Sequence, residues 1–153
     1  MLNRPHLSCR VMGIFLVREA DAGGRFSWPG PDRLRPLTAA GWRQAQELAE
    51  RLDGVHITRI VSSPWLRCQQ TVLPVAEARD LPIDSEPGLG QIASVDRALH
   101  LVVQAADDTV FCTHPELLFA LIERLRAGGR RVRPLCGVAW TTGCVAPEVV
   151  IAG

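Results

Sequence analysis

Lysine is absent from this chain, and all seventeen of its basic residues are arginine. We attribute this to a GC-rich coding bias, although the planar guanidinium also suits bidentate contacts to phosphate. The five cysteines include no C-x-x-C pair and no spacing typical of a zinc site, and a chain of 153 residues does not need disulfide bridges to fold. We therefore expect no metal, no cofactor and a location in the reducing cytoplasm.

Long apolar runs and a strong net charge are also missing. The run from Met12 to Val17 spans six residues, which is too short for a signal peptide or a membrane span. The net charge of +1 creates no field that favours nucleic acid or an anionic membrane as a partner. With 47% hydrophobic residues, the chain is expected to form one domain over residues 1–153.

Turn and capping residues divide the chain into alternating strands and helices. Helices are expected to begin at four capping or first-turn positions, which are Thr38, Ser63-Pro64, Ser94 and Pro115. The expected strands are Gly13–Val17, Ile57–Val61, Leu81–Ile83, Thr109–Cys112, Gly137–Thr142 and Glu148–Ile151. This alternation predicts an α/β fold, a three-layer sandwich with a mainly parallel central sheet.

Three unusual local sequences follow expected strands. They are Arg18-Glu19, the run from Ser62 to Arg67, and Thr113-His114-Pro115. In sheets of this kind ligands bind beyond the carboxyl ends of the strands, where helix N-termini present free backbone N–H groups. Two arginines, one histidine and two helix N-termini are therefore expected to converge on one pocket, as a phosphoryl group with its spread negative charge requires. Ser62 and Ser63 lack a G-x-S-x-G setting, so we expect them to cap the helix.

Several short stretches follow one another in an order that spans most of the chain. They are Leu16-Val17-Arg18, Asp32, Arg35-Pro36-Leu37-Thr38, Gly41, Gln44-Ala45, Ser62-Ser63-Pro64, Arg67-Cys68, Gln70-Thr71 and Cys112-Thr113-His114. With these stretches the chain resembles the histidine phosphatase superfamily, also called phosphoglycerate mutase-like. It is similar to the small single-domain branch that includes the bacterial phosphohistidine phosphatases, and to the phosphatase domain fused to some Nudix hydrolases. The resemblance implies a phosphoglycerate mutase-like fold and a hydrolase.

The resemblance also assigns roles to residues. In this family a histidine attacks phosphorus and forms a phosphohistidine, while two arginines and a second histidine hold the phosphoryl oxygens. Arg18, Arg67 and His114 match the phosphate-binding positions, whereas Glu19 occupies the position of the nucleophilic histidine. Gln91 stands where many members carry the acid that protonates the leaving oxygen, and an amide cannot serve as that acid.

Glu19 decides the functional prediction. Its carboxylate is expected to bridge Arg18, Arg67 or His114 and to fill the pocket as an internal phosphate mimic. The chain is then an impaired or inactive phosphatase homologue, a pseudoenzyme with a binding or regulatory role toward a small phosphorylated molecule or a phosphoprotein. The alternatives are an active phosphohydrolase with a modified mechanism, a Glu19 that is only a solvated loop residue, and a Glu19 introduced to trap an inactive form.

An arginine-rich surface offers an alternative of another class. It comprises Arg124, Arg126, Arg130, Arg131 and Arg133, at the end of one expected helix and in the loop after it. A solvated helix face that favours the C-terminal dipole explains most such clusters. The competing hypothesis is a protein-interaction module that binds an anionic partner through this surface.

Overall fold

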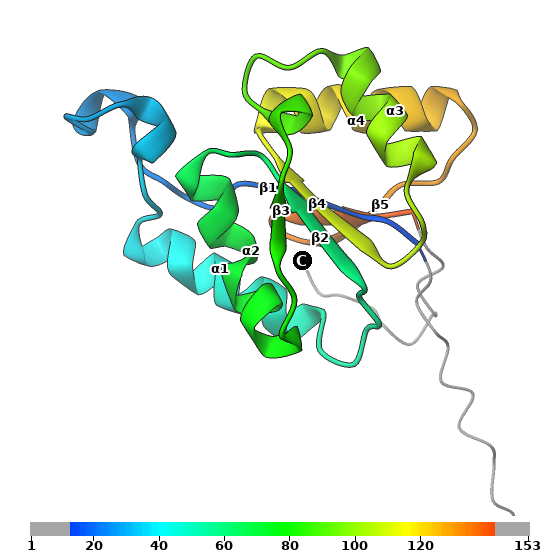
Figure 1. Cartoon of the computed structure of the whole chain (residues 1–153), viewed down its shortest axis with the longest axis horizontal. Coiled ribbons are helices and arrows are strands. Elements are labelled where there is room, and N and C mark those ends of the chain that lie inside the picture. The colour runs from blue at the N-terminus through cyan, green and yellow to red at the C-terminus, as the bar shows by residue number, and fades with distance from the viewer. Residues whose placement is uncertain (1–12, 143–153) are drawn as a thin grey trace, which may run out of the picture.

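The computed structural model describes residues 13–142, which form one mixed β-sheet covered by helices on both faces (Figure 1). The sheet has the strand order β3-β2-β4-β1-β6-β5. Its strands are β1 (Phe15–Arg18), β2 (Arg59–Ser62), β3 (Ile83–Ser85), β4 (Thr109–Thr113), β5 (Arg133–Cys136) and β6 (Ala139–Thr141). The pairs β1·β4, β2·β4 and β2·β3 are parallel, whereas β6 runs antiparallel to both β1 and β5. The predicted α/β fold with a mainly parallel sheet is confirmed in outline.

Alternating side chains of the strands build two separate cores. Phe15 and Val17 point to the face covered by α1 (Ala39–Arg51) and α2 (Leu66–Arg79). Leu16 points to the opposite face, which α3 (Val95–Gln104) and α4 (Pro115–Ala127) cover. Because successive residues of a strand face opposite sides, the apolar run from Phe15 to Val17 in β1 must be buried on both. The result is the expected three-layer sandwich, with a helix pair on each face (Figure 1).

The predicted caps hold for three of the four helices. The Thr38 side chain accepts a hydrogen bond from the Gly41 N–H at 3.1 Å, and Ser94 caps α3 in the same way. Pro115 occupies the first turn of α4, as expected. The prediction that Ser63 caps α2 is wrong, because α2 begins at Leu66 after Trp65 and has no side-chain cap.

The C-terminal strands also differ from the sequence prediction. Gly137–Thr142 contains β6, but its hairpin partner is β5, which the sequence analysis placed in an arginine-rich loop. Only Leu135 is buried in that short edge strand, which contains Pro134 and begins at an exposed arginine, so its pattern is not typical of a strand. The predicted strand Glu148–Ile151 lies outside the described residues.

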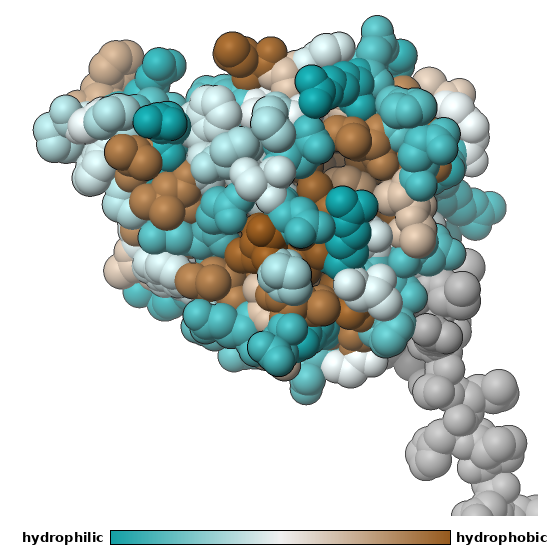
Figure 2. Space-filling view, viewed as in Figure 1, coloured by the Kyte–Doolittle hydropathy of each residue, from teal (hydrophilic) through white to brown (hydrophobic). Residues whose placement is uncertain are grey.

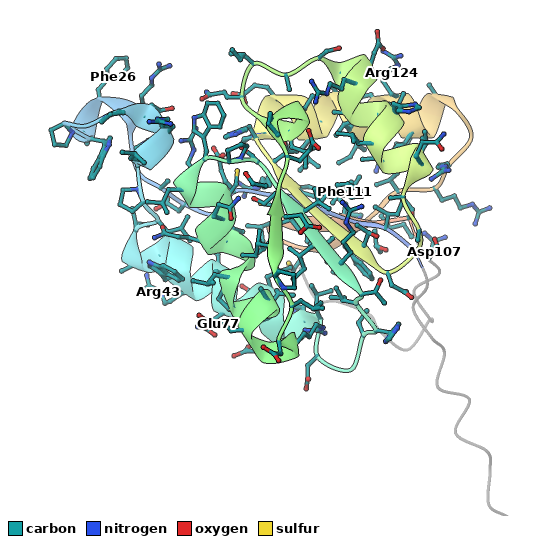
Figure 3. The ribbon with its side chains drawn as sticks, viewed as in Figure 1. Phe26, Arg43, Glu77, Asp107, Phe111 and Arg124 are labelled. Atoms are coloured by element: carbon teal, nitrogen blue, oxygen red, sulfur yellow. The ribbon has the colours of Figure 1, made fainter. Side chains whose placement is uncertain are left out.

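Apolar and polar residues are interspersed over the face of the molecule shown in Figure 2. Phe26 is the most exposed large apolar residue of the described part and lies at the outer end of the loop that carries a short 3-10 turn, Arg25–Ser27 (Figure 3). Within residues 13–142, no helix is long and apolar enough to cross a membrane.

Gly41 tests the contact between α1 and the loop after β1. A Cβ atom at this position would lie 2.0 Å from the Asp21 carbonyl oxygen, so the helix would have to move away from that loop. We expect Gly41→Ala to lower the free energy of unfolding by about 1–3 kcal/mol, although alanine ordinarily stabilises a helix relative to glycine. Urea denaturation measures the change. Gly137→Ala is the control, because no atom lies within 4 Å of its new Cβ. A Gly41→Ala protein as stable as the wild type would contradict this packing.

Candidate anion site at the carboxyl ends of the strands

Three segments meet at the carboxyl ends of the central parallel strands. Glu19 follows β1 and its N–H donates to the Thr113 carbonyl at 3.1 Å. Ser63 follows β2 and its N–H donates to the Cys112 carbonyl at 2.9 Å, while His114 follows β4. Because β2, β4 and β1 are neighbours in the sheet, Glu19, Ser63 and His114 lie side by side at one edge.

The Glu19 carboxylate lies between two cationic side chains. Its Oε2 atom is 2.6 Å from His114 Nδ1 and 3.1 Å from Arg67 Nε. The side chains of Arg67 and His114 are only 1% exposed, whereas that of Glu19 is 15% exposed. Arg67 Nε makes an ion pair by distance but no aligned hydrogen bond. The carboxylate thus occupies the position between the two cations and is the most exposed of the three groups.

Arg67 has further partners that hold its guanidinium in place. Nη1 donates to the Asp32 carbonyl at 2.9 Å, and Nη2 lies 3.3 Å from the Asp32 carboxylate. Nη2 also donates to Gln91 Oε1 at 3.2 Å. Arg35 fixes Asp32 from its other side through a contact of 3.0 Å. The structure therefore brings Gln91 to the site and adds Asp32, which the sequence analysis used only as part of a motif.

Arg18 lies apart from this cluster. Its guanidinium donates to the Gly137 carbonyl through Nε at 3.3 Å and Nη2 at 3.1 Å. Among residues 13–142 it takes no part in the ion pairs of Glu19. The expected bridge from Glu19 to Arg67 and His114 is present in the structure, whereas a bridge to Arg18 is not.

The far side of the His114 ring is also held. Ser63 Oγ lies 2.9 Å from Nε2, and the same oxygen accepts a hydrogen bond from the Trp65 N–H at 3.2 Å. The Trp65 ring meets the imidazole edge-on, with 5.4 Å between the ring centroids. Ser63 is engaged in this way instead of capping α2. These contacts direct Nδ1 of His114 toward Glu19.

Cys68 lies against Glu19 and His114, although the sequence analysis did not predict it as a site residue. Its Sγ atom lies 3.5 Å from Glu19 Oε2 and 3.9 Å from His114 Nε2. The side chain is fully buried beneath the ion pair. Because the three residues are far apart in the chain, no local spacing reveals the group.

The ion pair shifts the pKa of both partners. Burial lowers the pKa of His114, but hydrogen bonds to Cys68 and Glu19 outweigh it and raise this pKa to about 9. Burial also raises the pKa of the Cys68 thiol well above its usual value, so the thiol is neutral near pH 7 and Glu19 supplies the negative charge. Burial alone raises the pKa of Glu19, but His114 and Arg67 lower it overall. Near neutral pH Glu19 is therefore a carboxylate and His114 an imidazolium.

These shifts determine how stability depends on pH. The His114 pKa rises from 6.5 in the ordinary residue to about 9, so its stabilising contribution is complete below about pH 6.5 and is lost as the pH rises through about 9. The Glu19 pKa lies below its ordinary value of 4.5, so its contribution is present above that value and is lost on acidification. The pair stabilises the fold most between these two ordinary values.

Trp28 lies in the loop before α1. Its indole N–H donates to the Pro31 carbonyl at 3.0 Å. The ring lines a hollow of about 210 Å³ with Arg35 and Thr38. Trp65 packs directly on His114, whereas the hollow beside Trp28 contains none of the ion-paired residues of the site.

Comparison with known proteins finds phosphatases among the proteins that are similar to this chain. The family model described as histidine phosphatase superfamily (branch 1) matches residues 30–96. An 8-oxo-(d)GTP phosphatase of Mycolicibacterium smegmatis is 31% identical over 116 residues, which cover 72% of this chain and 36% of that protein. Phosphohistidine phosphatase SixA of Escherichia coli is 35% identical over 77 residues, which cover 49% of this chain and 46% of SixA. Each match thus spans less than half of the relative's length.

A solved structure adds a similarity in three dimensions. The protein histidine phosphatase SixA complexed with tungstate superimposes with a TM-score of 0.62 and 28% sequence identity. The superposition covers 73% of this chain and 75% of that one. The likeness therefore extends over most of the sheet and helices described above.

Glu19→Gln tests the electrostatics of the site. The substitution keeps the shape of the side chain but removes the charge that stabilises the imidazolium, so the pKa of His114 should fall well below about 9. Titration of the His114 ring protons by NMR measures this pKa. Asp84→Asn is the control, because it removes a carboxylate that is paired with Arg59 on the surface. A His114 pKa that is equal in wild type and Glu19→Gln would show that the two side chains are not paired in solution.

Proposed function

The chain contains a domain of the histidine phosphatase superfamily, as its motifs predicted, and we propose that this domain is a catalytically impaired homologue with a binding or regulatory role. The observation that carries the proposal is the contact of the Glu19 carboxylate with both Arg67 and His114. By resemblance, Glu19 stands at the position of the nucleophilic histidine. Its oxygen lies where an oxygen of a bound phosphoryl group would meet the same two cations.

A carboxylate is a poor substitute for the histidine nucleophile here. It repels an incoming phosphate, and one pair of unit charges about 4 Å apart costs about 4 kcal/mol at an effective dielectric constant of 20. The same arginine and histidine that would attract the phosphate already neutralise Glu19. To attack phosphorus, Glu19 would have to leave both partners.

The other groups of the site do not replace the missing chemistry. Near pH 7 both ring nitrogens of His114 carry protons, because its pKa is raised to about 9, so it has no lone pair for attack. Gln91, at the position of the acid, accepts a hydrogen bond from Arg67 and has no acidic proton to donate to a leaving group. Nucleophile and acid are thus both lacking under this proposal.

The binding role concerns phosphorylated ligands. The relatives include a phosphohistidine phosphatase and an 8-oxo-(d)GTP phosphatase, so a phosphoprotein or a small phosphorylated molecule is the class of ligand that we propose. Such a ligand must displace the Glu19 carboxylate from Arg67 and His114. In the competing interaction surface, Arg124 is paired with Asp96 and Arg126 donates to the Val132 carbonyl, whereas Arg130, Arg131 and Arg133 are exposed.

Hydrolysis of an aryl phosphate by the purified wild-type chain is the direct test. We expect no turnover, or turnover equal to that of Arg67→Ala, since a contaminating phosphatase contributes equally to both preparations. Steady-state release of the phenolate measures the rate. Turnover that Arg67→Ala abolishes would mean that the domain is an active phosphohydrolase with a modified mechanism.

Two substitutions at Glu19 test the phosphate mimic. Glu19→Gln removes the competing charge, and loss of a repulsion of more than about 1.4 kcal/mol tightens binding of inorganic phosphate at least about tenfold. Glu19→His should bind phosphate similarly and also gain phosphatase activity above the wild type. Calorimetry measures the affinity, with Asp84→Asn as the matched control for loss of a carboxylate. If neither Glu19 variant binds phosphate more tightly than wild type, Glu19 does not occupy the anion site.

A further inference from the structure

A nitrogen, a sulfur and an oxygen donor converge at the buried ion pair. Glu19, Cys68 and His114 each offer one ligand atom, and these atoms all lie within 4.8 Å of one another. The Cys68 thiol lies 3.5 Å from Glu19 Oε2, and the His114 ring lies 2.6 Å from the same oxygen. Tetrahedral coordination with metal–ligand bonds of 2.0–2.3 Å places ligand atoms roughly 3.3–3.8 Å apart. The spacing between Sγ and Oε2 already fits this range, whereas the contact between Nδ1 and Oε2 is shorter, so the Glu19 oxygen must draw back from the ring for the three donors to surround one ion.

We propose that Glu19, Cys68 and His114 form a binding site for Zn²⁺. The donor set selects this ion, because Mg²⁺ and Ca²⁺ prefer oxygen ligands whereas thiolate and imidazole suit zinc. Nδ1 of His114 is the nitrogen ligand, since it faces Glu19. Three protein ligands leave the fourth position to water. The inference goes beyond the proposed loss of catalysis and does not depend on it.

The surroundings of His114 match those of a metal ligand. A coordinating histidine usually donates its second ring N–H to a fixed acceptor, which orients the imidazole. Ser63 Oγ lies 2.9 Å from Nε2 and is itself held by the Trp65 N–H. Nδ1 lies 2.6 Å from Glu19 Oε2 and 3.5 Å from Arg67 Nη2, and a bound ion takes the place of its contact with Glu19.

Charge balance also permits the ion. Binding of Zn²⁺ releases two protons, one that His114 Nδ1 shares with Glu19 and one from the Cys68 thiol. Because two protons leave when one dication binds, the net charge of the cluster does not change. When Glu19 turns toward the ion, Arg67 keeps the Asp32 carboxylate at 3.3 Å and its bond to the Asp32 carbonyl. The buried guanidinium is therefore not left without an anionic partner. The ion enters past Glu19, which is more exposed than Arg67 or His114.

Titration of the reduced, metal-free chain with Co²⁺ tests the site. Cobalt takes the place of zinc in tetrahedral sites and produces a thiolate-to-metal absorption band. We expect this band to saturate at one ion per chain, to disappear when Zn²⁺ is added, and to be absent in Cys68→Ser. Cys136→Ser, which removes the half-buried cysteine of β5, is the matched control and should keep the band.

Glu19→Gln provides a second readout if Cys68→Ser does not fold, as judged by circular dichroism. Replacing this ligand should weaken Zn²⁺ binding at least about tenfold, because replacing a residue that only hydrogen-bonds to a metal ligand already weakens binding by about that factor. The inference is overturned if the wild type shows no thiolate band with Co²⁺ in excess, if folded Cys68→Ser keeps the band, or if Glu19→Gln binds Zn²⁺ as tightly as the wild type. Hydrolysis of aryl phosphate by metal-free protein tests the proposed function separately, so either proposal can fail alone.

Discussion

The buried ion pair of Glu19 with His114 and Arg67 is the interaction on which the site depends. Two cationic side chains that are almost fully buried require an anion, because an unpaired buried charge costs roughly 3–5 kcal/mol. Glu19 supplies that anion from within the chain. The resemblance implies that in the phosphatases the substrate is the anion that meets the corresponding positive charge. Under the proposed function, the same carboxylate that neutralises these buried cations also competes with a ligand.

The neighbours of the pair explain why its geometry is well defined. Ser63 holds the far nitrogen of His114, while Asp32 and Gln91 hold the far end of Arg67. Each cation thus keeps a polar partner on the side away from Glu19 when the carboxylate moves, and an incoming ligand or ion takes the place of the carboxylate at Nδ1 of His114. This property is common to both proposals. It lets a phosphorylated ligand displace Glu19, and it lets Glu19 turn toward a metal ion beside Cys68.

The order of the strands in the sheet creates this cluster. β4 lies between β2 and β1 although it is the latest of the three in the chain, so His114 is placed between the segments that carry Ser63 and Glu19. The crossovers through α1, α2, α3 and α4 put two cores on opposite faces and leave the carboxyl ends of the strands free. The edge strand β5 was not predicted, because a four-residue strand that contains proline and has one buried side chain lacks an apolar pattern.

The sequence by itself determined the layers of the fold, the family, the positions of Glu19 and His114 after strands and that of Arg67 near the start of a helix, since apolar periodicity, capping residues and ordered motifs are local properties. It did not determine which of these groups touch. Arg18 was expected in the pocket but donates to Gly137, and Ser63 was expected to cap α2 but holds His114. Cys68 contacts Glu19 and His114, which lie 49 and 46 residues away from it in the sequence. Such contacts depend on strand order, helix placement and rotamers, which only the packing of the whole domain decides.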